Sequence, residues 1–445
     1  MSIDEPEREG VRAAAVRVWG RVRGGDLGAL PVIVGLALIW TVFQIMNPVF
    51  LSSRNLVDLT MQCAAIGTIA LGIVVVLLLG EIDLSVGSVS GLASAILAVA
   101  FVQLRWPLVL AVIAAVAAGC LVGILYGLLY TRFGLPSFVI TLAGLLGFLG
   151  LQLWVLGDAG SINLPFDSWI VQFAQHAFLP EWASYVLVFA GTAAFAWTLA
   201  GRSRRRAAAN LDSQSYRAIA LRAALLLAVL LPATWYLNRS RGVGVMFLLF
   251  LALVVLLHLV LTRTRWGRAV YAVGGSVEAA RRAGIRVERI YLSVFALCSS
   301  LAAVGGVLAA ARLAAANQSS GAGDTNLNAI AAAVIGGASL FGGRGTAFAA
   351  LLGVIVIQSI SSGLTLLNLN SSVQFMVTGV VLVLAVTVDS LSRRTRVAAG
   401  QAVPDLVHRA ALAYVAAVRS SGVDLQEATA AVARAWAEKG PEVDR

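Results

Sequence analysis

Apolar segments long enough to cross a lipid bilayer recur along almost the whole of this chain. A membrane-spanning helix needs about 20 predominantly apolar residues, and only structures that satisfy their own backbone hydrogen bonds persist in a bilayer core. The chain is therefore expected to fold as a bundle of membrane helices. The segments predicted to span are residues 30–46, 59–79, 86–104, 108–130, 138–156, 182–199, 218–237, 243–261, 290–313, 347–367 and 373–388.

A further apolar run, residues 330–341, is too short to span as a regular helix and is broken by Gly336 and Gly337. Glycine pairs interrupt membrane helices where neighbouring elements can bond the freed backbone groups. We expect a discontinuous or re-entrant helix here. The predicted fold class is an all-α polytopic membrane protein with about 10–12 transmembrane helices.

Composition agrees with this class and limits the function. Of the 445 residues, 59% are hydrophobic and 12% are charged, against about 25% charged in a soluble domain. The net charge of +11 rests almost wholly on arginine, because Lys439 is the only lysine. On a membrane protein this excess orients cytoplasmic loops, and we prefer that interpretation to nucleic-acid binding. The three cysteines lie in apolar runs and provide no disulfide framework or metal-ligand spacing.

Arginine placement predicts which loops face the cytosol. Residues 263–290 hold seven arginines against two glutamates, and the N-terminal tail and the loop after residue 199 are also rich in arginine. Residues 157–183 hold neither lysine nor arginine. The positive-inside rule then places both termini in the cytosol and residues 157–183 outside, provided that the run 330–341 crosses. Arg239 and Arg241 are an exception on the outer side.

Residues 271–290, YAVGGSVEAARRAGIRVERI, form a polar island between two apolar segments. A helix here would carry a small apolar face beside a charged rim. The apolar face would consist of Val277, Ala280 and Ile285, and the rim of Glu278, Arg281 and Arg282. We interpret the island as a docking element presented to a cytosolic partner; the alternative is an ordinary charged loop.

The segment GEIDLSVGS, residues 80–88, places two carboxylates at a membrane boundary between two spans. Such groups are costly there unless they are capped or hydrated. We expect Asp83 or Ser85 to cap the following helix by accepting hydrogen bonds from its free N–H groups, and favour Asp83. The alternative places this turn, with Glu81, near the path of a solute.

Two other segments offer polar side chains beside apolar runs. In residues 321–345, GAGDTNLNAIAAAVIGGASLFGGRG, these are Asp324, Asn326, Asn328 and Ser339. A broken helix exposes backbone donors and acceptors that suit a hydroxyl-rich solute, although small residues also favour a tight helix-packing seam. In residues 135–142, LPSFVITL, Pro136 is expected to open a helix and to leave Ser137 and Thr141 for polar contacts.

The four segments GEIDLSVGS, LPSFVITL, YAVGGSVEAARRAGI and LNAIAAAVIGGASLFGGRGT occur in this order. Together they resemble the permease family of bacterial ABC sugar importers, and most closely its xylose-type and ribose-type members. The resemblance covers residues 30–389, nearly the whole membrane region. Extra spans within residues 182–242 favour the xylose type.

The resemblance implies a division of the chain and a set of partners. Residues 1–29 would be a cytoplasmic tail, 30–389 the transmembrane permease domain and 390–445 a second cytoplasmic tail. The loop 262–290 would couple to a tandem-cassette ATPase, the subunit that binds ATP. A second permease copy would share the solute path, and an extracytoplasmic sugar-binding protein would deliver a monosaccharide, with a xylose-like pentose favoured.

The same resemblance assigns roles to residues. Contact with the ATPase would come from Gly274, Gly275, Glu278, Ala279, Ala280, Gly284 and Ile285. Candidates for the translocation path are Glu81, Asp83, Ser85, Ser137, Thr141, Asp324, Asn326, Asn328 and Ser339. In the C-terminal tail, apolar residues at helical spacing within 403–436 predict a small helical hairpin.

Other function classes fit less well. A phosphate-binding loop needs Gly-Lys-Ser/Thr, whereas Lys439 precedes Gly440, so the chain is not itself the ATPase. We find no catalytic constellation and expect a transport subunit with no cofactor and no resident metal. An ion-driven secondary transporter would place ionisable groups in mid-membrane. A permease for branched-chain amino acids would need a cationic or helix-N-terminal site for a carboxylate. Both remain alternatives.

Overall fold

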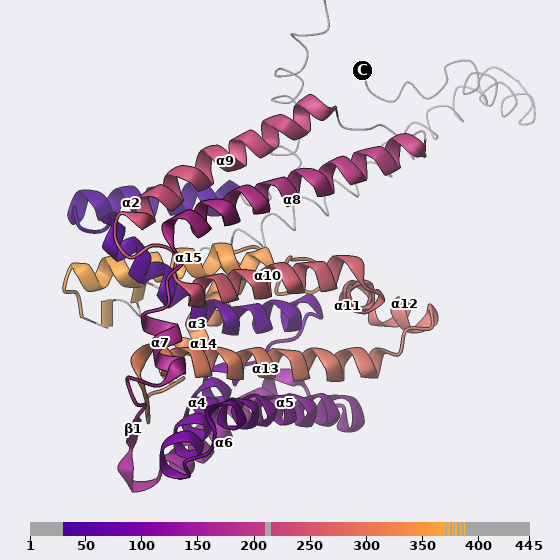
Figure 1. The fold of residues 1–445 in the computed structure, drawn as a ribbon. Helices are drawn as coiled ribbons and strands as arrows, with labels where there is room; N and C mark the ends of the chain where they lie inside the picture. Colours follow the sequence, from indigo (N-terminus) through magenta and orange to yellow (C-terminus); the bar gives the residue numbers. More distant parts are fainter. Residues whose placement is uncertain are drawn as a thin grey trace, which may run out of the picture. The chain divides into compact units, whose positions relative to one another are not determined.

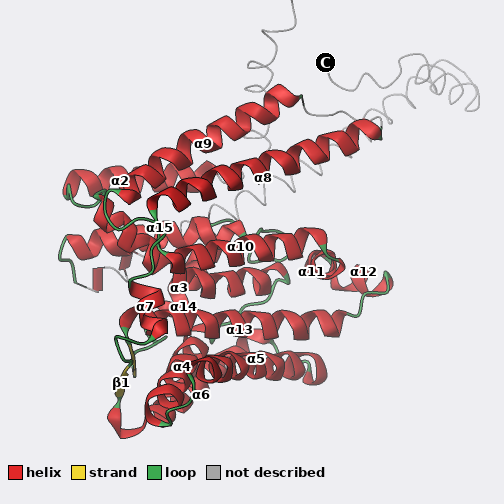
Figure 2. Cartoon of the chain, in the orientation of Figure 1, coloured by secondary structure: helices red, strands yellow, loops and turns green. Residues whose placement is uncertain are grey.

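The computed structural model describes residues 30–209 and 215–370, together with isolated positions between 372 and 387. The described residues are almost entirely helical (Figure 2). The helices from the start to the middle of the chain are α2 Leu30–Met46, α3 Ser53–Leu78, α4 Val86–Ala98, a π-helix Val99–Gln103, α5 Leu108–Phe133, α6 Ser137–Leu156, a 3₁₀ turn Gly157–Ala159, α7 Trp169–Gln175, α8 Glu181–Ala208 and α9 Tyr216–Asn238. The later helices are α10 Val245–Arg263, α11 Arg265–Gly275, α12 Val277–Arg282, α13 Val287–Leu313, α14 Thr325–Ile335 and α15 Phe348–Leu366.

The predicted fold class is confirmed. Within the described residues, nine helices are long and apolar enough to cross a membrane, and two shorter apolar helices, Val32–Met46 and Thr325–Ile335, accompany them. The predicted extra spans between residues 182 and 242 correspond to α8 and α9, which pack against each other (Figure 1). The predicted tails, the hairpin at 403–436 and most of the span 373–388 lie outside the described residues.

Helices α3 and α13 form the centre of the bundle, and α13 packs on α3, α4 and α5. The seam between α5 and α13 depends on Gly119, Gly123 and Gly127, which face the α13 backbone at successive turns. A methyl group on any of them would collide with α13, for example with the carbonyl of Phe295 beside Gly123. Small residues four apart let membrane helices approach this closely. Our reading of the sequence missed this seam.

Two membrane segments are discontinuous. Helix α14 ends at Ile335, and no further helix begins before Phe348, which confirms the predicted break at Gly336 and Gly337. A second non-helical stretch follows α3: residues 79–85 run without helix before α4 begins at Val86, where the predicted spans 59–79 and 86–104 leave a connection. Asp83 and Ser85 in this stretch are fully buried within the protein.

The bundle has two different ends (Figure 1). At the α12 end lie α11, α12 and the start of α13. At the β1 end, strand β1 (Ser161–Asn163) pairs antiparallel with β2 (Ala315–Asn317), in the register Ser161↔Asn317, Ile162↔Ala316 and Asn163↔Ala315. This small sheet joins the segments that follow α6 and α13, and α7 lies beside it.

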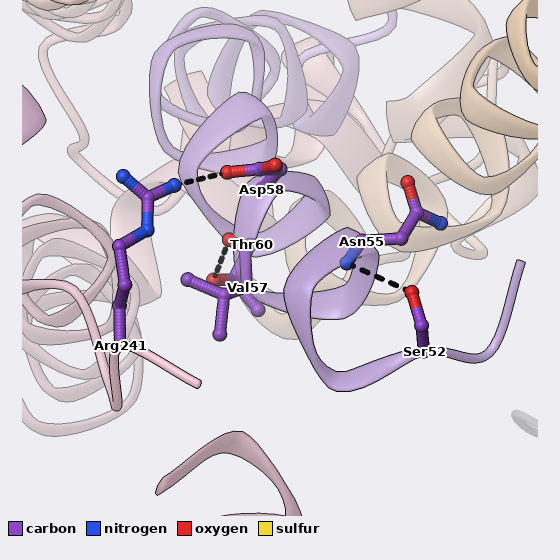
Figure 3. A network of polar contacts seen from close by, with 6 residues as sticks. All are labelled: Ser52, Asn55, Val57, Asp58, Thr60 and Arg241. Atoms are coloured by element: carbon purple, nitrogen blue, oxygen red, sulfur yellow. Dashed lines mark hydrogen bonds and ion pairs between the residues drawn. The ribbon is translucent and has the colours of Figure 1, made fainter. Parts of the chain in front are cut away.

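The loop between α9 and α10 docks on the start of α3 (Figure 3). There Ser52 caps α3 by accepting a hydrogen bond of 3.3 Å from the Asn55 N–H. The Arg241 guanidinium forms an ion pair with the Asp58 carboxylate and lies 5.0 Å from the centroid of the Phe178 ring. Arg239 lies at the same distance from the Trp235 ring. The two arginines that break the positive-inside pattern therefore both have local partners, one of them a carboxylate.

Candidate functional site

The polar island is not a single helix but the end of α11, the short helix α12 and the start of α13. Ser276 caps α12 by accepting a hydrogen bond of 3.3 Å from the Ala279 N–H. Gly284, with φ +79°, ends the helix: its N–H bonds the Arg281 carbonyl and the Ile285 N–H bonds the Ala280 carbonyl, both at 3.0 Å. This pair of bonds is a Schellman motif. The sequence thus fixes both ends of α12.

The apolar face of α12 is turned toward the helix bundle itself. Ala280 is buried, and Val277 and Ile285 pack against the hydrophobic core. Because Ala280 is buried and Val277 and Ile285 are half-buried, little of this face is left for a partner, and its role as the anchor stays a prediction. What α12 exposes is Ala279 and a charged surface, in which the Arg282 guanidinium donates to the Glu278 carboxylate over 2.5 Å.

The base of this element is joined to both discontinuous segments. Gly274, in the last turn of α11, lies against the Leu78 carbonyl at the end of α3 and the Gly343 N–H. The Gly343 N–H in turn donates to that Leu78 carbonyl over 2.8 Å. The Tyr271 hydroxyl donates to the Gly345 carbonyl over 2.8 Å, and burial raises the pKa of this phenol, which keeps it a donor. A movement of α11 would therefore act on the loop after α14 directly.

Asp83 is fully buried inside the protein. Its Oδ1 accepts hydrogen bonds from the Ser85 N–H (2.8 Å) and the Ser85 hydroxyl (2.7 Å), and its Oδ2 lies 3.8 Å from the Cys298 Sγ. The Tyr126 hydroxyl donates to Ser85 Oγ over 2.7 Å. Of the two residues predicted to cap α4, Ser85 does occupy the N-cap position, but it makes no side-chain capping bond. The favoured residue, Asp83, instead has Ser85 and Cys298 as its partners. These bonds fix the non-helical segment between α3 and α4.

Replacing Asp83 with alanine should therefore destabilise the protein. The Ser85 N–H and hydroxyl would both lose their buried acceptor, which costs about 1–3 kcal/mol for each unsatisfied group. Asp83→Asn retains one acceptor oxygen and should cost less. Thermal unfolding of the purified protein in detergent measures the difference, with the exposed Asp158→Ala as the control. Equal melting temperatures for D83A and D158A would contradict this role.

Glu81 lies at the α12 end of the bundle, where the segments 80–88 and 135–142 meet. Its Oε2 accepts a hydrogen bond of 2.5 Å from the Ser137 hydroxyl, and its Oε1 accepts one of 2.6 Å from the Tyr130 hydroxyl. A pocket of about 420 Å³ opens beside this carboxylate, lined by Glu81, Tyr130, Gly134, Leu135, Pro136, Ser137 and Phe138. Glu81 and Ser137, named separately from the sequence, therefore form one site.

The other residues predicted to line the translocation path make their contacts outside the Glu81 pocket. The Asn326 amide donates to the Leu84 carbonyl over 2.6 Å, which links α14 to the segment before α4. The Asn328 amide instead donates to the Asp324 carboxylate over 2.9 Å, within α14 and its N-cap.

Thr141 is buried, and its hydroxyl donates to the Ser137 carbonyl over 2.9 Å. Ser339 lies in the loop after α14, where its hydroxyl accepts from the Phe341 N–H over 3.3 Å. None of these residues lines the Glu81 pocket.

Sequence reasoning missed the tyrosines at this site. The rings of Tyr130 and Tyr291 pack in a tilted arrangement with their centroids 4.5 Å apart, and Tyr126 reaches Ser85 from the preceding turn of α5. A usable signal existed, because Tyr126 and Tyr130 are four residues apart in an apolar span and so share one helix face. Among the described residues, no group of three or more His, Cys, Asp or Glu side chains could hold a metal ion.

Comparison with known proteins identifies the family of this chain. The family described as "Branched-chain amino acid transport system / permease component" matches residues 55–386, from the start of α3 to beyond α15. The chain belongs to this family. The matched region contains both discontinuous segments, the Glu81 pocket and the whole of α12.

Individual relatives are transport permeases. The xylose transport system permease protein of Escherichia coli K12 is 37% identical over 346 residues, covering 78% of this chain and 87% of the relative. That of Haemophilus influenzae is 34% identical over 84% of this chain and 99% of its own length. The ribose import permease protein of Bacillus subtilis is 34% identical over 82% of this chain and 94% of its own. No solved structure matches the chain.

Proposed function

We propose that this chain is the membrane permease subunit of an ATP-driven sugar importer and that it translocates a monosaccharide, a xylose-like pentose being favoured. The support is its similarity along most of its length to permeases named for xylose and ribose transport. The paired helices α8 and α9 add to the xylose-type resemblance. The protein is a multi-pass membrane protein, and we place it in the bacterial inner membrane with both termini in the cytosol.

In this proposal α12 receives the movement of the ATPase. The observation that carries it is structural: a short, capped and exposed helix is fixed at its base to the end of α3 and to the loop after α14. Because the apolar residues of α12 face the bundle, the ATPase would contact Glu278, Ala279, Gly284 and the flanking arginines. Gly274, Ala280 and Ile285 would transmit the movement, and Gly275 would lie beside the contact.

The other partners follow from the two ends of the bundle. A tandem-cassette ATPase would bind the arginine-rich α12 end. An extracytoplasmic sugar-binding protein would deliver solute at the β1 end. A second copy of the permease would complete the path, as in other symmetric assemblies, and the exposed apolar faces of α5, α6, α8 and α9 would contact lipid or that copy.

Branched-chain amino acids are the second candidate cargo, because the family description names them. An amino acid carries a carboxylate and would need a cationic partner within the path. The Glu81 pocket instead presents a carboxylate, hydroxyls and aromatic rings, which suit a neutral, hydroxylated solute better than a carboxylate.

The proposed function predicts the energy source. In proteoliposomes that contain the permease, its ATPase and its binding protein, D-xylose uptake should require ATP and should persist when ionophores collapse ion gradients. Uptake is measured with radiolabelled D-xylose, with ATP replaced by a non-hydrolysable analogue as the control. Strong proton-driven uptake by the permease alone would falsify the assignment in favour of a secondary transporter.

A further inference from the structure

The Glu81 pocket combines a carboxylate, hydroxyls and aromatic rings in one cavity. The walls come from three places: the non-helical segment after α3, the last turn of α5 and the first turn of α6. Its volume of about 420 Å³ lies within the range of about 300–1,000 Å³ typical of small-molecule sites. Phe138 is 55% exposed, whereas Ser137 at the floor is 5% exposed. The pocket is thus open at one side and polar at its base.

The polar groups leave hydrogen-bonding capacity for a ligand. Two hydroxyls already donate to the Glu81 carboxylate, but a carboxylate has about four acceptor positions. The remaining positions can accept hydroxyl protons from a ligand, and hydrogen bonds to a charged acceptor are the strong ones. Tyr130 and Phe138 add ring surface, and Leu135 and Pro136 add apolar walls. A carboxylate with hydroxyls and aromatic surface suits a neutral ligand that carries several hydroxyl groups.

The pocket is also connected to α12. The Tyr130 side chain that bonds Glu81 packs against the ring of Tyr291, in the second turn of α13, with the ring centroids 4.5 Å apart. Helix α13 follows α12 after only residues 283–286. A displacement of α12 would therefore reach the Glu81 carboxylate through these two rings. This contact path links the pocket to the helix that we assign to ATPase contact.

We propose that this pocket binds the transported monosaccharide at the α12 end of the path, as the last site before release. The inference rests on the proposed function, because it takes α12 to be the ATPase contact. Solute hydroxyls bond the free acceptor positions of Glu81, with the sugar lying against Tyr130 and Phe138. Movement of α12 shifts Tyr291 and Tyr130 and so loosens the site.

Site-directed labelling of the full permease tests the site without ATPase or binding protein. Leu135→Cys in a Cys120→Ser background places one accessible thiol on the pocket wall, since Leu135 is 42% exposed and Cys63 and Cys298 are buried. The rate of reaction with a water-soluble maleimide is measured with and without D-xylose, D-ribose or choline. We expect either pentose to slow labelling. Adding Glu81→Gln should weaken this protection about tenfold in pentose concentration, whereas Glu181→Gln, an exposed carboxylate at the start of α8, should not.

The outcomes separate this inference from the proposed function. If the complete transporter imports D-xylose with ATP but no pentose protects the thiol introduced by Leu135→Cys, the pocket is not a solute site and the transport role stands. Protection by choline and not by pentoses would identify a cation site and overturn the inference. Protection without ATP-driven import would retain the site and overturn the transport role. The labelling in the Glu81-containing protein is informative even if the Glu81→Gln variant fails to fold.

Discussion

Replacing Gly274 with alanine should abolish most ATP-driven uptake and lower the melting temperature of the permease. A Cβ at this position would collide with the Leu78 carbonyl and crowd the Gly343 N–H. These are backbone atoms that bond each other over 2.8 Å, so they cannot move aside as a flexible side chain would. Overpacking of a close contact costs about 1–3 kcal/mol. We expect this cost to appear partly as a lower melting temperature and partly as a displacement of the loop after α14.

The neighbouring glycine provides a matched control. A Cβ on Gly275 would meet nothing within 4 Å, and the same α11 carries both residues. Gly275→Ala should therefore unfold at the wild-type temperature. Both variants are compared by thermal unfolding in detergent and by ATP-driven D-xylose uptake in proteoliposomes. If the two alanine variants behaved alike, close approach of α11 to α3 would not be what Gly274 provides.

The second large effect is expected at Gly284, where valine should uncouple ATP hydrolysis from transport. Gly284 has φ +79° and open space around it, so backbone conformation and not crowding is the constraint. A left-handed conformation costs a residue with a side chain about 1–2 kcal/mol, and a β-branched residue suffers most. The Schellman bonds would weaken, and the end of α12 would no longer hold its position on the bundle.

Asparagine separates this effect from a general intolerance of side chains, because it adopts the left-handed conformation more readily than valine does. Sugar transported per ATP hydrolysed should fall in the order glycine, asparagine, valine, with the thermal stability of the membrane bundle little changed. Glu278→Ala, which alters the exposed surface of α12, should also lower this ratio. Normal coupling in Gly284→Val and Glu278→Ala would show that α12 is not the ATPase contact.

Much of the architecture could be predicted from local sequence. Spans are found because each must be apolar over about 20 residues, and the break at Gly336 and Gly337 is visible as a glycine pair in a short apolar run. The non-helical connection before α4 follows from the predicted span ends at residues 79 and 86, but its burial does not. Only the packing of Asp83 beside Cys298 and Ser85 reveals that this connection lies inside the protein.

Individual residues of the candidate site were predicted from the sequence, but their meeting in one pocket was not. Glu81 and Ser137 are 56 residues apart in sequence, and Glu81 and Tyr130 are 49 apart. No periodicity links positions on different helices, since their meeting depends on how α5 and α6 are placed beside the end of α3. Tyr291 is more distant still, on α13. The pocket is therefore a product of packing between helices.

By itself the sequence determined the membrane class, most spans, the broken helix and the charged island, because hydrophobicity and helix-ending residues act within a few turns of chain. The tertiary structure decided which way the island faces. Ala280 is apolar in either environment, so only the presence of the bundle beneath α12 turns it inward and leaves the charged residues outside. It also decided that Glu81, Tyr130 and Ser137 share one pocket, because side chains on separate helices meet only when the helices pack.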